Sequence, residues 1–143
     1  PAGSVCGELA AACDILPTFA RLAKAELPKR KIDGKNIWHL MSGKEGAKSP
    51  HKAFYFYKGK GLRAVRSGHW KLHISSNNRK EQQSSKKPAL TLYNLSKDIS
   101  ETTDVAAENE PIVKRLYNQA QKFDKALKAD ARPPGEVKTE TKG

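Results

Sequence analysis

Residues 62–74, LRAVRSGHWKLHI, place two arginines, one lysine and two histidines among large apolar residues. Within this stretch, Ser67-Gly68 is a turn signal between two runs that are rich in strand-forming residues. The stretch therefore predicts a β-hairpin with a two-residue loop. Such a loop gives the cross-strand pairs Arg66–His69, Val65–Trp70, Ala64–Lys71 and Arg63–Leu72.

The predicted hairpin has one apolar face and one basic face, because side chains alternate between the two faces of a strand. The apolar face is expected to pack in a core, and the basic face to meet solvent or a partner. Arg63 falls on the apolar face and would need a carboxylate or carbonyl partner, because an unpaired buried charge is costly. The apolar face holds Val65, Trp70, Leu72 and Ile74; the basic face holds Ala64, Arg66, His69, Lys71 and His73.

Helices and further strands are predicted on both sides of the hairpin. Aromatic residues favour the strands, and apolar residues at 3.6-residue spacing favour the long helix. The order indicates an α+β fold, with an antiparallel sheet of about four strands packed against a long C-terminal helix. The predicted elements are a helix that Asp14 caps and that stops before Pro28, a helical turn over 36–41, strands over 53–57 and 90–95, and a helix that begins at Glu108 or Asn109.

Two segments lack apolar anchors. Residues 75–88, SSNNRKEQQSSKKP, are polar and are expected to form a mobile loop. Residues 130–143 are expected to form a disordered tail. The 143-residue chain is long enough for one domain with a single core, which we place at residues 1–129.

The composition favours negatively charged partners. Lysine and arginine total 27 against 15 aspartate and glutamate, a formal charge of +12. Such a balance suits nucleic acid, sulfated polysaccharide or an acidic membrane surface. No stretch approaches the ~20 apolar residues that cross a bilayer. Pro1 is not an initiator methionine, so we expect a piece of a longer protein, and the N-terminus leaves the compartment open.

The sequence offers no catalytic or metal-binding set. Cys6 and Cys13 have no zinc-type spacing and are expected to be free thiols in a buried or partly buried segment, since pairing them requires the backbone to fold back. His69 and His73 lie roughly 13 Å apart along a strand, too far for one metal ion. Glu101 and Asp104 belong to a predicted turn and are expected to cap backbone groups.

Short motifs follow one another in a characteristic order over residues 1 to about 128. They are PAGSVCGELAAACDILPTFARLAKAELP, Ile32-Asp33-Gly34-Lys35, Ser49-Pro50-His51, AFYFY, LRAVRSGHWKLH, LYNLSKD and Glu101-Thr-Thr-Asp104-Val-Ala-Ala. Together they resemble the C-terminal region of formylglycine-dependent sulfatases, the arylsulfatase family. Two positions depart from the family: Ile99 replaces the usual proline of D-P-x-E, and Asp104 replaces an asparagine.

The resemblance implies a sulfuric ester hydrolase whose catalytic domain lies upstream and is completed by a strand-and-helix segment at residues 1–27. Formylglycine is made from a cysteine or serine in C-x-P-x-R, and neither Cys6 nor Cys13 fits that motif. The family's metal carboxylates come from Asp-Asp and Asp-Asn pairs, which this sequence lacks. Calcium and formylglycine are therefore implied for the intact enzyme alone, and this piece is expected to be inactive with no catalytic residue and no metal ligand.

The resemblance also indicates where a substrate would approach, because loops of the smaller C-terminal sheet help to wall the pocket in such enzymes. The candidate contacts are Arg66, His73, Asn77 and Arg79. A basic wall would attract a sulfated ester or saccharide. Alternatively, these residues belong to a solvated loop that lies far from the substrate. A polar composition is usual for surface loops and does not by itself indicate a binding role.

Two other classes of function stay open. The chain could be a free-standing basic module that binds sulfated polysaccharide or nucleic acid, or a domain that docks another chain. Nucleic acid is disfavoured, because the lysines are dispersed and the aromatic residues form no exposed stacking row. The resemblance implies an exported location, periplasmic or extracellular, or in some members a lysosomal one.

Overall fold

The computed structural model describes residues 2–74 and 89–131. The predicted loop over 75–88 lies outside the described residues, and so do Asn77 and Arg79. Residues 132–143 of the predicted tail lie outside them as well.

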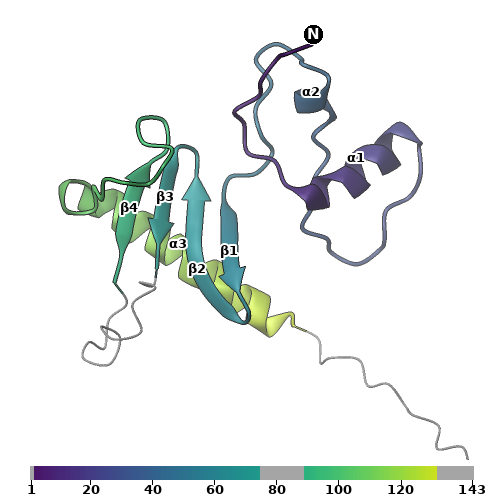
Figure 1. Ribbon diagram of the computed structural model, residues 1–143. Coiled ribbons are helices and arrows are strands. Elements are labelled where there is room, and N and C mark those ends of the chain that lie inside the picture. The colour runs from purple at the N-terminus through teal and green to yellow at the C-terminus, as the bar shows by residue number, and fades with distance from the viewer. Residues whose placement is uncertain (1, 75–88, 132–143) are drawn as a thin grey trace, which may run out of the picture.

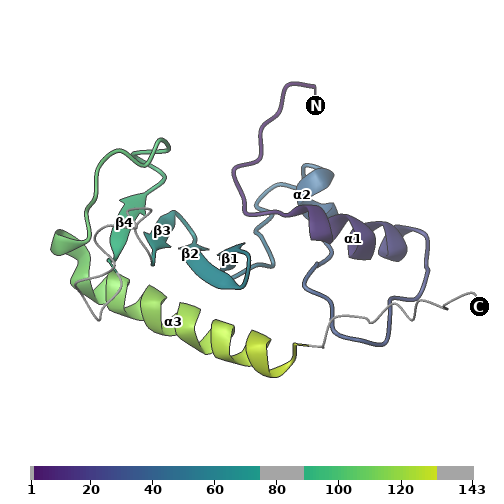
Figure 2. The same cartoon turned by 60° about the horizontal axis from the view of Figure 1, so that its bottom comes forward.

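The chain forms an N-terminal part, which comprises the described residues before β1 and carries two short helices. A sheet follows it, and one face of the sheet is covered by a long helix (Figure 1). The sheet is an antiparallel meander in the order β1-β2-β3-β4. Figure 2 shows α3 running across one face of it. The predicted α+β fold is confirmed. The elements are η1 (Ala12–Asp14), α1 (Ile15–Leu22), α2 (Trp38–Met41), β1 (Phe54–Lys58), β2 (Gly61–Ser67), β3 (Trp70–His73), β4 (Thr91–Asn94), η2 (Ala107–Asn109) and α3 (Glu110–Ala129).

The hairpin of β2 and β3 has a different register from the predicted one. Ser67 pairs with Trp70, so the two loop residues are Gly68 and His69. Gly68 has a φ of 58°, and glycine in the first loop position tolerates this left-handed value without strain. The pairing moves by two residues, which leaves each side chain on its predicted face because the alternation has a period of two. The predicted pairs are therefore wrong, although the predicted faces are largely right.

A β-bulge takes Arg63 out of the predicted alternation. Phe56 pairs with Ala64 while Tyr57 pairs with Leu62, so Arg63 is the extra residue of β2. Leu62 consequently points to the helix side, where it packs against the core. The regular alternation from which Arg63 was placed on the apolar face is therefore interrupted at this residue.

The core lies between the sheet and α3. Burying each large aliphatic side chain contributes about 1.5–3 kcal/mol, so this layer accounts for most of the cohesion of the sheet and helix. At the edge of the sheet, Tyr55 stacks on Phe123 with 3.7 Å between ring centroids, which ties β1 to α3. The buried members of the core are Val65, Leu72, Ile74, Leu92, Leu116 and Ala120.

The first helix is shorter than the sequence predicts. It ends at Leu22, because Lys24 adopts a φ of 54° and the Ala25 N–H donates to the Ala20 carbonyl at 2.9 Å. This is the Schellman arrangement that closes many helices. Residues 2–11 form no strand in this chain, and a strand there would need a hydrogen-bonded neighbour. No helix of the described ranges is long and apolar enough to cross a membrane.

Candidate functional site on the open face of the sheet

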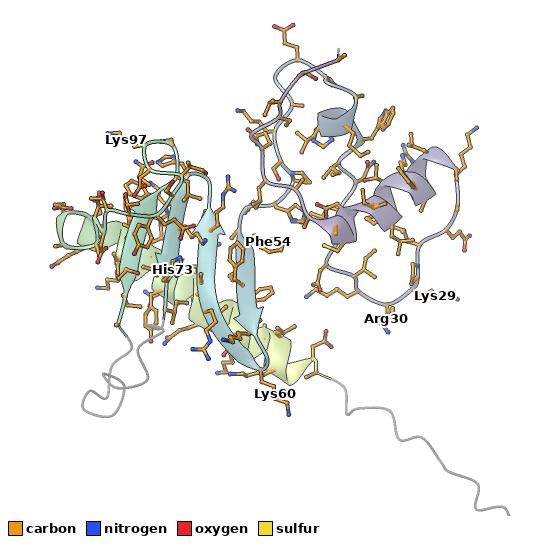
Figure 3. All side chains as sticks on the ribbon, in the orientation of Figure 1. Lys29, Arg30, Phe54, Lys60, His73 and Lys97 are labelled. Atoms are coloured by element: carbon orange, nitrogen blue, oxygen red, sulfur yellow. The ribbon has the colours of Figure 1, made fainter. Side chains whose placement is uncertain are left out.

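The face of the sheet that α3 leaves uncovered carries a group of charged and aromatic side chains, and we call it the open face. Opposed residues of neighbouring strands point to the same side of a sheet. Figure 3 labels two of its residues, Phe54 on β1 and His73 on β3. Its members are Phe54, Phe56, Ala64, Arg66, Lys71, His73, Thr91 and Tyr93.

Glu101 holds two cationic or protonatable side chains of this face. One carboxylate oxygen, Oε1, lies 2.6 Å from Lys71 Nζ, and the other, Oε2, lies 2.6 Å from His73 Nε2. The His73 ring meets the Tyr93 ring edge-on, with centroids 5.4 Å apart. Lys71 Nζ also lies 5.1 Å from the centre of the Phe56 ring. The three polar groups and their aromatic neighbours form one continuous cluster.

The Glu101 carboxylate is ionised at neutral pH. Burial taken alone would raise its pKa, but hydrogen bonds from Lys71 and His73, together with their charges, hold the pKa below its usual value. Its backbone has a φ of 57°, an unusual value for a residue other than glycine. The surrounding contacts therefore hold this carboxylate in a defined place.

Two of the predicted substrate contacts, Arg66 and His73, lie on the open face. Arg66 lies opposite Lys71, and His73 lies opposite Ala64, so the two are diagonal neighbours on adjacent strands. The Arg66 Nε donates to the Gly68 carbonyl at 3.1 Å, and Arg66 lines a cleft of about 500 Å³ with His69. His73 instead belongs to the Glu101 cluster. The two residues therefore share a face but make different contacts.

Sequence reasoning missed the role of Glu101. It predicted a backbone cap, which is what the neighbouring Asp104 provides, since its Oδ1 accepts from Leu92 N at 2.9 Å and Ala106 N at 3.0 Å. Glu101 binds side chains instead. Its partners lie 30 and 28 residues earlier in the chain, so no local spacing signals the contact.

A second buried carboxylate, Asp14, joins the N-terminal motifs. Its side chain is fully buried and accepts from the Ala11 and Lys35 backbone N–H groups and from His51 Nε2, each at 2.8 Å. The first element, the Ile32–Lys35 motif and the Ser49–His51 motif therefore meet at one group. Asp14 was predicted to cap the first helix, but its side chain makes no cap bond to α1.

Several large apolar side chains of the N-terminal part are exposed. Val5 is the most exposed of them, at 93%. In α1 the buried residues are Pro17 and Thr18, while the apolar stripe faces outward. The exposed residues are Val5, Ile15, Leu16, Phe19, Leu22, Leu27, Trp38 and Met41.

The two cysteines lie at the surface of the chain. Cys6 and Cys13 are free, as predicted, but both are exposed instead of buried or partly buried. Among the residues that the structure describes, no three His, Cys, Asp or Glu side chains are grouped so that they could hold a metal ion.

Comparison with known proteins identifies the class. The family described as the C-terminal region of aryl-sulfatase matches residues 49–139, and the chain belongs to this family. Arylsulfatase A of Bos taurus is 33% identical over 150 residues, which cover 88% of this chain and 29% of that protein. Arylsulfatase A of Homo sapiens is 33% identical over 148 residues, which cover 90% of this chain and 29% of that protein.

Solved structures also superimpose on this chain. Ps i-CgsB superimposes with a TM-score of 0.60 at 25% identity, covering 82% of this chain and 24% of that one. A second structure of it, in complex with k-i-k-neocarrahexaose, superimposes with a TM-score of 0.56, also at 25% identity, and covers 78% of this chain and 23% of that one. The chain therefore spans less than a third of the length of each of these relatives.

Proposed function

We propose that this chain is the C-terminal portion of a sulfuric ester hydrolase and that it supports a catalytic domain encoded upstream. The exposed apolar surface of the N-terminal part carries the proposal. Val5, Leu16 and Phe19 are more than half exposed, although apolar side chains that cluster on a surface usually have a partner. Family membership and the short span of the match support the upstream chain as that partner.

In this proposal the reactive groups belong to the upstream domain. Neither Cys6 nor Cys13 lies in a C-x-P-x-R motif, and the described residues provide no metal-binding group. The residues present therefore do not fit calcium or formylglycine, which belong elsewhere in the intact enzyme. A calcium ion bound there would polarise the sulfate ester. The isolated chain is then inactive.

The open face would form part of the wall of the substrate pocket. Lys71 and His73 place cationic or protonatable groups on this face, which would favour an anionic sulfate ester. Arg66, Asn77 and Arg79 stay candidate contacts in the same wall. The complex of Ps i-CgsB with k-i-k-neocarrahexaose supports a saccharide ester as the substrate class.

The test is hydrolysis of a chromogenic aryl sulfate in the presence of calcium. The isolated chain is compared with the intact protein at equal concentration. Activity in the intact protein alone is expected, and a catalytic-domain piece ending before residue 1 should also lose activity. Turnover by the 143-residue chain would overturn the proposal. Inactivity of both, with salt-dependent binding to a sulfated polysaccharide, would favour a binding module instead.

A further inference from the structure

We infer that Glu101 is a positioning residue that orients His73, so that the ring presents its Nδ1 atom to an anionic substrate. The inference rests on the proposed function, in which His73 lies in the wall of the pocket. Glu101 itself would touch no substrate atom. It would act through the imidazole that it holds.

Glu101 engages one of the two nitrogens of the His73 ring. Nε2 is engaged by Glu101 Oε2 at 2.6 Å. In the part of the chain that the structure describes, Nδ1 makes no hydrogen bond, and 37% of the side chain is exposed. The edge-on contact with Tyr93 limits the tilt of the ring. A flip of the imidazole would sacrifice a charge-assisted hydrogen bond, so one orientation is favoured.

The second oxygen of Glu101 is committed as well. Oε1 accepts from Lys71 Nζ at 2.6 Å, so each carboxylate oxygen has its own partner. The carboxylate therefore cannot rotate without breaking the contact to Lys71. Two anchored oxygens hold the imidazole more firmly than a single exposed hydrogen bond, because side-chain entropy is already lost.

The backbone of Glu101 provides an independent observation. Its φ of 57° is a left-handed value that destabilises residues other than glycine. Such strain persists where the surroundings over-determine the conformation, and it clusters at functional sites. A glycine would relieve the strain but would lose the carboxylate. Glutamate at this position instead keeps the carboxylate that binds Lys71 and His73.

The hydrogen bond to Glu101 also selects the tautomer. A neutral ring carries its proton on Nε2, which donates to the carboxylate, and keeps a lone pair on Nδ1. In the protonated ring Nδ1–H becomes a second donor, which can bind a sulfate oxygen while Nε2–H stays on Glu101. Without Glu101 the ring could rotate, and neither nitrogen would be held toward the substrate.

A double-mutant cycle in the intact protein tests the inference. Glu101→Gln is expected to raise KM for an aryl sulfate roughly fivefold, with kcat within about twofold, because one charge-assisted bond is weakened. In a His73→Ala background the same substitution should leave KM unchanged. An equal rise of KM in both backgrounds would show that Glu101 acts through the fold, and would overturn the inference. If the single variant His73→Ala has the same KM as the wild type, the inference is also overturned.

A second measurement needs no activity. Nitrogen-15 NMR of the 143-residue chain is expected to show the Nε2–H tautomer of His73, and mixed tautomers in Glu101→Gln. Lys71→Met, which keeps the His73 contact, serves as the control and should retain the Nε2–H form. A wild-type ring in the Nδ1–H form would overturn the inference. The expected tautomer in a protein that hydrolyses no sulfate ester would instead reject the proposed function, and with it the role toward substrate, while the contact itself stands.

Discussion

At the scale of single residues, Gly34 allows the N-terminal part to close. A Cβ atom at this position would lie 1.9 Å from the Cys13 carbonyl oxygen, a distance that backbone atoms cannot accept. The next residue, Lys35, donates its N–H to Asp14, so the two segments cannot move apart without losing that bond. The glycine in the Ile32–Lys35 motif is therefore required by close approach.

We expect Gly34→Ala to destabilise the N-terminal part by about 2 kcal/mol or more, because overpacking against backbone forces a shift. Urea unfolding followed by tryptophan fluorescence measures the change, with Trp38 as the reporter in this part. Gly7→Ala is the matched control, since no atom lies within 4 Å of a Cβ built there. Equal midpoints for the two variants would contradict the close-approach argument.

Asp14 is the other residue on which the N-terminal part depends. Burial alone would raise its pKa, but hydrogen bonds from Lys35, Ala11 and His51 lower the pKa below its usual value. Its stabilising contribution is therefore complete above the unfolded pKa of about 3.9 and is lost as the pH falls through the folded pKa.

Asp14→Asn is expected to lower the free energy of unfolding at neutral pH by roughly 2–4 kcal/mol, because buried donors lose their anionic acceptor. Melting temperatures measured from neutral to acidic pH should converge for the variant and the wild type as the pH falls. Asp33→Asn, at an exposed neighbouring position, is the control and should track the wild type. A constant difference at all pH values would contradict the role of the ionised carboxylate.

At the scale of elements, α1 carries an apolar stripe that is largely exposed. The stripe includes Leu16, Phe19 and Leu22, all exposed. Pro17 and Thr18 form its buried side, where Thr18 Oγ1 donates to the Asp14 carbonyl and accepts from Ile37 N. The helix is therefore positioned by polar contacts, and its apolar surface is left for the proposed upstream domain.

Phe19→Ala separates the isolated chain from the intact protein. In the isolated chain we expect a change below about 0.5 kcal/mol, because the ring is exposed. In the intact protein we expect a loss of roughly 3 kcal/mol, the usual result of removing a buried phenylalanine. Chemical denaturation of both forms measures the difference. As a control, Phe123→Ala removes the stack on Tyr55 and should destabilise both the isolated chain and the intact protein. Equally small effects of Phe19→Ala in the two forms would show that the stripe of α1 does not dock on the upstream domain.

At the scale of the whole molecule, the chain divides into parts of unequal stability. The buried core comes from the sheet and α3, and none of its fully buried members comes from the N-terminal part. Figures 1 and 2 show α1 and α2 to one side of the sheet, whereas α3 packs against the sheet itself. Local opening requires least free energy where few apolar contacts are buried, so the N-terminal part should open first.

Amide hydrogen exchange of the isolated chain is expected to follow this division. The amides of Val65, Leu72 and Leu92 should exchange slowest, and those of α1 much faster. In the intact protein the α1 amides should become protected if the upstream domain covers them. Equal protection of α1 in both forms would contradict the proposed partner of this surface.

The sequence determined the α+β class, the order of the elements and the faces of the hairpin. These follow from local patterns: side chains alternate along strands, and apolar residues recur at helical spacing in α3. The motif order was also enough for the resemblance to the sulfatase C-terminal region. The element signals each lie within a short window, and the motif order is read directly along the sequence, so no contact between distant residues was needed to recognise them.

Only the tertiary structure decided the hairpin register, the bulge at Arg63, and the partners of Glu101 and Asp14. Register depends on how β3 pairs with β4 and packs on α3 as well as on its own turn, and two adjacent loops were both chemically acceptable. Glu101 and Asp14 bind His73 and His51, which are 28 and 37 residues away. Contacts over such separations form when the whole chain folds, because no local preference brings their side chains together.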